Sequence, residues 1–364
     1  MKGGALCKVI SIEALANRII REAVEDEATD IHIIPKPQGS LLQFRISNKL
    51  HTKFILPPKQ CDKLISHFKF TASMDIGERR RPQNGAYSLK LKDQKIGLRF
   101  STLPSSPHES LVIRILQEKN DIPIHYISLF PETSRKLIAL LKHAHGLVIF
   151  TGPTGSGKTT TLYSLLNENA HLYHRNVISL EDPIERPQEN VLQIQVNEKA
   201  GITYSTGLKA ILRHDPDIIM VGEIRDGETA EIAIRAALTG HLVITTMHTR
   251  DAKGAIGRLM EFGIQKQEIE QTLIAVTAQR LVELVCPFCD GECSPYCFSV
   301  SERLKRASVF EIITGKTIMS ILRGASQGKE KIYKTLAQNI NKGIALGFIK
   351  EEEYERWVFD YEKE

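Results

Sequence analysis

The chain has 364 residues, of which 42% are hydrophobic and 25% are charged, a composition typical of a soluble globular protein with two or three domains. Its formal net charge of +5 is modest, whereas nucleic-acid-binding proteins concentrate positive charge far more strongly, so we expect no sequence-specific nucleic-acid binding. No apolar stretch approaches the roughly 20 residues that a membrane-spanning helix needs, and residues 1–15 carry no secretory signal, so we expect a cytoplasmic protein that reaches a membrane only through a partner.

The first part of the chain predicts an α+β domain over residues 1–120. Apolar residues at a spacing of about 3.6 predict helices over 11–28 and 59–76. Alternating apolar and polar residues predict strands over 30–34, 41–46, 86–91, 95–101 and 110–116. The next segment, 121–131, contains two prolines and no sustained period, and it is predicted to be a linker.

Residues 132–285 predict a parallel sheet with helices on both faces, and therefore an α/β fold. Near-continuous apolar runs predict strands over 146–151, 176–180, 217–222 and 242–246. Helices are predicted between these strands, over 132–144, 158–169, 206–213 and 227–239. Beyond residue 260 we expect a mostly helical chain, interrupted by a cysteine cluster at 286–297 and ending in a helical C-terminal region over 298–364.

The first apolar strand runs directly into the sequence Gly-Pro-Thr-Gly-Ser-Gly-Lys-Thr at 152–159, which fits the phosphate-loop pattern G-x-x-x-x-G-K-[ST]. Its glycines allow backbone amides to converge on phosphate oxygens, and the following helix offers its positive N-terminus to the same anion. Lys158 would reach the β- and γ-phosphates, while the Thr159 hydroxyl would help to hold Mg²⁺. The pattern thus predicts a nucleoside triphosphate site at Gly152, Pro153, Thr154, Gly155, Ser156, Gly157, Lys158, Thr159 and Thr160.

Acidic residues end two of the predicted strands: Glu181 ends the strand at 176–180, and Glu223 ends the strand at 217–222. Ligand sites in parallel sheets lie at the carboxyl ends of the strands, so both acids are catalytic candidates. We assign Glu181 to Mg²⁺, through the nucleotide, and Glu223 to orienting the attacking water. Histidines flank the strand at 242–246, and a histidine beside such a site can donate a hydrogen bond to the γ-phosphate. We assign that role to His241, which precedes the strand.

The order of these motifs resembles that of the secretion ATPases of type II secretion and type IV pili. The matching segments are GPTGSGKTTTLY at 152–163, EDPIE at 181–185, LRHDPDIIMVGEIRD at 212–226 and TGHLVITTMHT at 239–249. In that family they are called Walker A, Asp box, Walker B and His box. Segments of the first domain, at 29–33, 79–85, 98–104 and 112–116, also resemble the family, so the resemblance covers almost the whole chain.

The resemblance implies a RecA-like P-loop domain that hydrolyses ATP with Mg²⁺, preceded by a smaller, PAS-like α+β domain. It also implies a homo-hexamer in which Arg99 and Arg114 reach the developing phosphate charge; the alternative for both is an ordinary surface salt bridge. The implied partner is a polytopic inner-membrane platform protein, through which the ATPase acts indirectly on pilin assembly. The expected location is the cytoplasmic face of the cell membrane, where the protein binds peripherally.

The sequence Gln-Arg-Leu at 279–281, followed by cysteines, resembles the assembly and secretion branch rather than the retraction motors. Because the chain lacks a long extra N-terminal domain, we find it most similar to the competence traffic ATPases of Gram-positive bacteria, which serve a transformation pilus and DNA uptake. Three alternatives are a pilus retraction motor, a DNA-translocating secretion or conjugation ATPase, and a regulatory nucleotide-binding scaffold.

Four cysteines, spaced C-x₂-C-x₃-C-x₃-C, crowd into residues 286–297. Four thiolates suit a closed tetrahedral Zn²⁺ site, but the compressed spacing strains that geometry. The sequence leaves both a zinc site and unliganded thiols open at Cys286, Cys289, Cys293 and Cys297.

Overall fold

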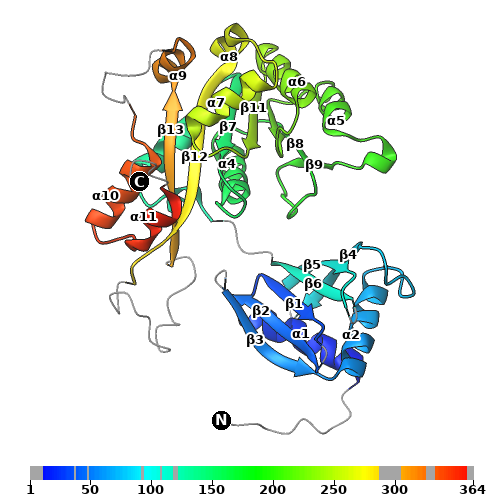
Figure 1. Cartoon of the computed structure of the whole chain (residues 1–364). Coiled ribbons are helices and arrows are strands. Elements are labelled where there is room, and N and C mark those ends of the chain that lie inside the picture. Colours follow the sequence, from blue (N-terminus) through cyan, green and yellow to red (C-terminus); the bar gives the residue numbers. More distant parts are fainter. Residues whose placement is uncertain are drawn as a thin grey trace. The chain divides into compact units, whose positions relative to one another are not determined.

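The computed structural model describes the chain over 11–36, 38–46, 49–91, 94–106, 109–117, 122–286, 305–324 and 333–358. The chain divides into two compact units, unit 1 (Met1–Asn120) and unit 2 (Asp121–Glu364), which are drawn in Figure 1. Each unit has hydrophobic core clusters of its own. None of the helices in the described ranges is both long enough and apolar enough to cross a membrane.

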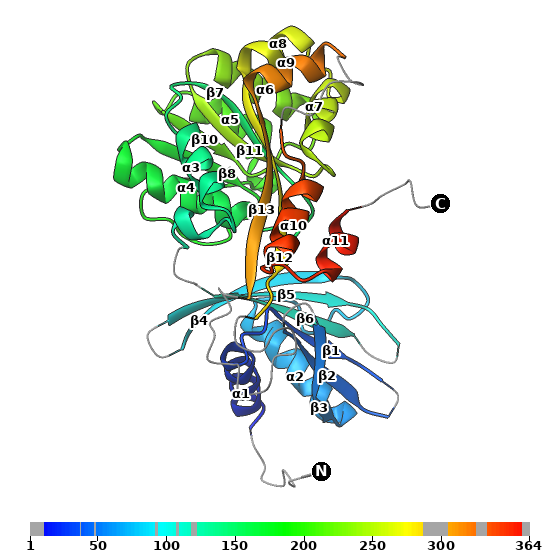
Figure 2. The same cartoon turned by 90° about the vertical axis from the view of Figure 1, so that its left-hand side faces the viewer.

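Within its described residues, unit 1 is a six-stranded antiparallel sheet of order β3-β2-β1-β6-β5-β4, with two helices. The helices are α1 (Ile12–Glu25) and α2 (Pro58–Thr71), and Figure 2 shows both on the same side of the sheet. The strands are β1 (Asp30–Ile34), β2 (Ser40–Ile46), β3 (Lys49–Leu56), β4 (Gln83–Leu91), β5 (Gln94–Leu103) and β6 (Ser110–Gln117).

Strand alternation separates the two faces of this sheet. Ile31 and Ile33 of β1 are fully buried in a core that includes Ile19 of α1 and Phe68 of α2. Asp30 and His32, which alternate with them along β1, point to the opposite face, because successive side chains of a strand alternate. Asp30 and the other polar residues in register with it therefore share the face without helices.

A buried ion pair fixes the loop between α2 and β4. Lys69 is 0% exposed, and its Nζ donates to Glu109 Oε1 (3.1 Å) and Oε2 (3.0 Å) and to the carbonyl oxygen of Glu78 (2.6 Å). Gln83 Nε2 donates to the carbonyl oxygens of Asp75 and Glu78, both at 2.9 Å. These bonds hold the backbone at Asp75 and Glu78, directly before the basic segment 79–81.

Unit 2 is built on a seven-stranded sheet of order β13-β12-β7-β11-β10-β8-β9 in its described residues. All neighbouring strands are parallel except β12 and β13. The predicted parallel sheet is thus confirmed. The strands are β7 (Gly146–Thr151), β8 (Val177–Glu181), β9 (Leu192–Gln195), β10 (Ile218–Val221), β11 (Leu242–Met247), β12 (Leu273–Glu283) and β13 (Arg306–Thr314).

Helices cover both faces of this sheet. In β7, Leu147 and Ile149 belong to the core shared with α5–α9, whereas Val148 and Phe150 belong to the core shared with α3 and α4. The helical segments are η1 (Ile124–Tyr126), α3 (Pro131–Leu140), α4 (Lys158–Leu172), η2 (Glu198–Ala200), α5 (Tyr204–Ile211), α6 (Gly227–Leu238), α7 (Ala252–Glu261), α8 (Lys266–Thr272), α9 (Gly315–Leu322), α10 (Leu336–Ala345) and α11 (Glu352–Trp357).

The prediction of a mostly helical chain after residue 260 is wrong at two places. Residues 273–283 form β12, which pairs in parallel with β7, and 306–314 form β13, which pairs with β12. Most of β12 is buried, polar residues included, so its sequence lacks the alternation of a half-exposed strand. In Figure 1 β12 and β13 lie beside α10 and α11; α10 contacts both strands, and α11 contacts β12.

The segment predicted as a linker, 121–131, belongs in part to the packed structure of unit 2. Ile124, in η1, and Ile127 are buried in the core on the α3 and α4 side of the sheet. The two prolines and the short 3₁₀ turn removed the helical period that would have revealed this packing.

Candidate active site

The phosphate loop joins the end of β7 to α4 and rests on β12. Gly152, Gly155 and Gly157 have φ values of 147°, 79° and 88°, which favour glycine. A Cβ on Gly152 would lie 2.6 Å from the carbonyl oxygen of Gln279, and one on Gly157 would lie 2.9 Å from Gln279 Nε2. Glycine is therefore required at both ends of the loop by the strand behind it.

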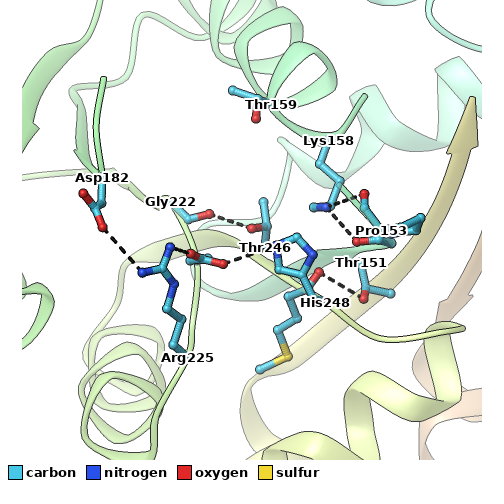
Figure 3. Close-up of polar contacts among 12 residues, drawn as sticks. Thr151, Pro153, Lys158, Thr159, Asp182, Gly222, Arg225, Thr246 and His248 are labelled. Carbon is cyan, nitrogen blue, oxygen red and sulfur yellow. Dashed lines mark hydrogen bonds and ion pairs between the residues drawn. The ribbon is translucent and has the colours of Figure 1, made fainter. Parts of the chain in front are cut away.

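Lys158 begins α4 and turns its ammonium group toward its own loop. Its Nζ donates to the carbonyl oxygens of Gly152 (2.7 Å) and Pro153 (3.0 Å), as Figure 3 shows. Burial lowers the pKa of Lys158 to about 8, an effect that Arg280 reinforces and the Glu223 carboxylate opposes. The ammonium is thus a desolvated donor beside the loop, and phosphate oxygens would be better acceptors than peptide carbonyls.

Ser156 adds an unsatisfied donor to the loop. Its side chain is 1% exposed, and its Oγ has no hydrogen-bond partner. A buried hydroxyl without a partner is rare in native proteins and costs free energy. The loop amides, this hydroxyl and Lys158 form a donor set that suits phosphate oxygens.

Thr159 and Glu185 pair two oxygen ligands at the mouth of the loop. The Thr159 hydroxyl donates to Glu185 Oε1 at 3.3 Å. Hydroxyl and carboxylate oxygens are ligands that suit Mg²⁺. The sequence prediction missed Glu185, although it ends the EDPIE segment.

Glu181, to which we had assigned Mg²⁺, faces inward. It is 3% exposed; its Oε1 accepts from Ser179 Oγ (2.6 Å) and Gln193 Nε2 (2.9 Å), and its Oε2 accepts from the hydroxyl of Tyr163. Both of its carboxylate oxygens are thus bonded to protein donors, and the bond from Tyr163 connects β8 to α4. Thus the carboxylate that the structure brings to Thr159 is Glu185, while the assignment of Glu181 to Mg²⁺ stays a prediction.

Glu223 lies just beyond the carboxyl end of β10 and connects three neighbouring segments. Its Oε2 lies 3.3 Å from Nε2 of His248, and its Oε1 contacts the Arg225 guanidinium. Arg225 also reaches Asp182 Oδ2 at 3.5 Å. In Figure 3 the side chains of Arg225, His248 and Lys158 surround one region at the carboxyl ends of the strands.

His248 stands in this group as a neutral donor. Burial, and then the charge of Lys158, lower its pKa from the ordinary 6.5, while the Glu223 carboxylate acts in the opposite direction. An imidazole of this kind is neutral at pH 7 and carries one N–H.

The structure does not bring His241 to the phosphate loop. Its Nδ1 lies 3.0 Å from the carbonyl oxygen of Ala236, and its own carbonyl accepts from the N–H of Gly146 at 3.0 Å. Gly146 begins β7, so His241 lies at the amino end of the sheet, a full strand length from the phosphate loop. His248 follows β11 and reaches the correct end; the carboxyl-end rule, applied to this pair, would have selected it.

The predicted arginines lie in unit 1. Arg99 of β5 is in register with Arg114 of β6, Arg114 with Asp30, and Asp30 with Arg45 of β2. The Asp30 carboxylate is buried and accepts from Arg114 Nε at 2.9 Å, but the Arg114 side chain stays 64% exposed. A row of charges thus crosses the open face of the sheet.

The cysteine cluster lies almost wholly outside the described residues. Cys286 is half-buried just after β12, while Cys289, Cys293 and Cys297 belong to the part that is not described. Elsewhere, in the described ranges, three or more His, Cys, Asp or Glu residues nowhere gather in a way that could hold a metal ion.

Comparison with known sequences gives matches along nearly the whole chain. The family model described as "Type II/IV secretion system protein" matches residues 7–356. Competence protein ComGA of Bacillus subtilis is 55% identical over 350 residues, which cover 96% of this chain and 98% of that protein. ComGA of Halalkalibacterium halodurans is 40% identical, with 94% and 98% covered. Type II secretion system protein E of Klebsiella pneumoniae is 44% identical over 76% of this chain and 55% of its own length.

Solved structures give the same picture of the fold. The pilus retraction motor PilT with bound ADP has a TM-score of 0.73 at 26% identity, covering 98% of this chain and 99% of that one. The Legionella pneumophila ATPase DotB has a TM-score of 0.76 at 19% identity, with 97% of each chain covered, a likeness of fold alone.

Proposed function

The chain belongs to the type II/IV secretion system protein family, and we propose from this premise that it is the assembly motor of a competence pilus. It is an ATPase with a RecA-like P-loop unit, related to the motors of type II secretion and type IV pili. The finer proposal is that ATP hydrolysis drives assembly of a pseudopilus that supports DNA uptake. The 55% identity to a competence protein over nearly its whole length supports this choice.

We assign binding of ATP to the phosphate loop. Lys158 exchanges its loop carbonyls for the β- and γ-phosphates, and the Ser156 hydroxyl and the loop amides bind the remaining phosphate oxygens. Thr159 and Glu185 would hold Mg²⁺. When bound with the nucleotide, Mg²⁺ neutralises part of the phosphate charge.

Glu223 orients the attacking water, and His248 donates its N–H to the γ-phosphate. The 3.3 Å approach of these two side chains is the observation that carries the proposal, because it joins the acid to a γ-phosphate donor beside Lys158. Arg225 holds Glu223 in place through its link to Asp182. Glu181 positions β8 and α4 beneath them.

The active form in this proposal is a homo-hexamer at the cytoplasmic face of the cell membrane. Arg99 and Arg114 would reach the developing phosphate charge in the ring, where such an arginine is worth several powers of ten in rate. Closure on ATP and release after hydrolysis would move a polytopic platform protein in the membrane, which inserts pilin subunits. In this proposal the ATPase does not bind DNA directly, since its net charge of +5 is modest.

Steady-state ATP hydrolysis tests the site. Lys158→Ala should abolish turnover, and Glu223→Gln should lower kcat about 100-fold while ADP binding persists, since only the orientation of water is lost. Glu231→Gln, on the exposed surface of α6, is the matched control and should keep normal turnover. Normal turnover in Glu223→Gln would refute its assigned role.

The direction of the motor is tested in cells. The gene should restore transformation to a Bacillus subtilis strain that lacks ComGA, and the Glu223→Gln form should not. If the protein were a retraction motor, which its similarity to PilT makes the second candidate, its loss would leave filaments in place instead of preventing them.

The metal content of the purified protein decides between the two interpretations of the cysteine cluster. A closed site made by four thiolates gives about one Zn²⁺ per chain when no chelator is used. Four titratable thiols within 286–297 and no zinc would remove the metal from the proposal.

A further inference from the structure

Arg280 of β12 lies against the phosphate loop and is bonded to the loop that carries His248. Its Nη1 donates to the carbonyl oxygen of Gln279 (2.9 Å), the same oxygen that faces Gly152, and Nη1 would lie 3.1 Å from a Cβ on that glycine. Its Nη2 donates to the carbonyl oxygen of Arg250, two residues after His248. One buried guanidinium therefore fixes the backbone behind the phosphate loop and the backbone of the His248 loop.

The C-terminal helix α11 covers this guanidinium. The Trp357 ring centre lies 5.5 Å from Cζ of Arg280, and the indole is held by a 2.8 Å bond from its Nε1 to Glu353 Oε2. Glu353 is 4% exposed, and it also accepts from Arg356 at 3.0 Å. The ring is thus fixed on α11 by a buried acid and presents its face to Arg280, which is 5% exposed.

A second contact ties the same C-terminal region to the same loop. The Glu311 carboxylate, 3% exposed in β13, accepts from the backbone N–H of Ala252 (3.1 Å) and from that of Leu336 (3.0 Å). Ala252 begins α7 directly after the His248 loop, and Leu336 begins α10. The carboxylate also faces the positive charge of Arg280.

We propose that Trp357 and Arg280 couple the C-terminal helix α11 to the phosphate loop, with Arg280 as a positioning residue for ATP. The inference rests on the proposed role of that loop in ATP binding. Arg280 touches no reacting atom; it sets the distance between the phosphate loop and the His248 loop. A movement of α11 then changes the affinity for nucleotide, and nucleotide binding is felt at Trp357, because coupling between sites is reciprocal.

The coupling is directly observable, because Trp357 is the single tryptophan of the chain. Mg·ADP added to the full-length protein should give a saturable change in Trp357 emission, with the same midpoint as ADP binding measured by equilibrium dialysis. The change should vanish in Lys158→Ala, which loses the nucleotide. If the wild-type protein binds ADP without any change in emission, the coupling is refuted. If it binds no nucleotide, the proposed function fails as well.

Kinetics of substitutions at both partners test the positioning role. Arg280→Lys keeps the charge but loses the planar fork, so KM for ATP should rise about tenfold with little change in kcat. Trp357→Ala should raise KM about fivefold through the lost cation–π contact, and Trp357→Phe should restore most of the affinity.

Arg175 offers a matched control at the amino end of the sheet. It also donates to two backbone carbonyls, those of Leu141 (2.9 Å) and His143 (2.8 Å), and it also lies over an aromatic ring, that of Tyr173 (5.7 Å). Arg175→Lys loses the same kinds of contact and should leave KM within about twofold of wild type. Equal KM values for the two lysine variants would show that Arg280 is merely structural.

Discussion

His248 and His241 belong to one short motif but lie at opposite ends of β11, and this difference decides their roles. His248→Ala should lower kcat about 10- to 100-fold, because the γ-phosphate loses a donor and Glu223 loses its neighbour. His241→Ala removes an imidazole whose Nδ1 contacts Thr239 and Ala236 at the end of α6, and it should leave kcat unchanged. ATP hydrolysis by the two variants under saturating substrate makes the comparison, and equal losses would contradict the placement.

The depressed pKa of Lys158 predicts a proton linked to nucleotide binding. Phosphate oxygens favour the charged ammonium, so ADP binding near pH 8 should take up a proton, and affinity should fall as the pH rises above about 8. Calorimetric titration in buffers of different ionisation enthalpy measures this uptake. Lys158→Arg is the control, because its guanidinium stays charged throughout; the same proton uptake in that variant would assign the proton elsewhere.

The same shift affects the stability of the nucleotide-free protein. The folded pKa of about 8 lies below the 10.5 of the unfolded chain, so between these pH values the unfolded chain binds the extra proton. The penalty for burying the charged group is fully present below about 8 and is gone above 10.5. The free energy of unfolding, compared with that of Lys158→Met, should therefore rise with pH across this window.

At the scale of elements, the Lys69–Glu109 pair predicts the stability of unit 1. Lys69→Met leaves the Glu109 carboxylate buried without its partner and should destabilise unit 1 by about 3–5 kcal/mol. Combining it with Glu109→Leu should recover much of that loss, since no charge then remains buried. Hydrogen exchange of the amides of α2 and β6 in the full chain reads unit 1 selectively. If adding Glu109→Leu to Lys69→Met lowers the stability of unit 1 further instead of restoring it, the two residues are not coupled.

The strands that could be predicted are those whose burial is visible as an almost continuous run of apolar residues. The bounds of β7, β8, β10 and β11 agree with the predicted ranges to within one residue, because both faces of these strands are covered and their sequences are almost continuously apolar. β12 is also mostly buried, yet it includes Gln279 and Arg280, which find their hydrogen-bond partners only in the folded site. No local pattern reveals such partners.

The same distinction holds in the active site. The phosphate loop could be located from its sequence because spacing and glycine content suffice. The different surroundings of Glu181 and Glu185 in the EDPIE segment could not be predicted from the sequence. The fold places buried hydrogen-bond donors around Glu181 and places Thr159 beside Glu185. Sequence reasoning also did not select Arg225, whose carboxylate partners, Asp182 and Glu223, follow two different strands.

At the scale of the whole molecule, the arginines of unit 1 predict how active sites are shared in a ring. Arg99→Ala and Arg114→Ala should each bind ATP nearly as well as wild type but turn over more slowly, because their contacts strengthen as charge develops. Mixing Lys158→Ala chains with Arg99→Ala chains should restore part of the activity if the sites are composite. Lys158→Ala mixed with Glu223→Gln is the control, since both lesions lie in unit 2. No recovery in stably mixed rings would favour a site within one chain.

The sheet order of unit 2 also governs when this protein can first bind a nucleotide during its synthesis. The phosphate-loop strand β7 has both of its neighbours far downstream, β11 from residue 242 and β12 from residue 273. Strand pairs so distant in the chain form slowly, because loop closure precedes the gain from pairing. The strands of unit 1 pair mostly with close neighbours in the sequence, so unit 1 can fold on the ribosome. At that stage β7 still lacks its neighbouring strands, and its backbone edges are unpaired and its apolar faces are exposed. The nascent chain thus passes through a long aggregation-prone interval that ends only when β12 emerges, and a chaperone that binds apolar strands would act in that interval.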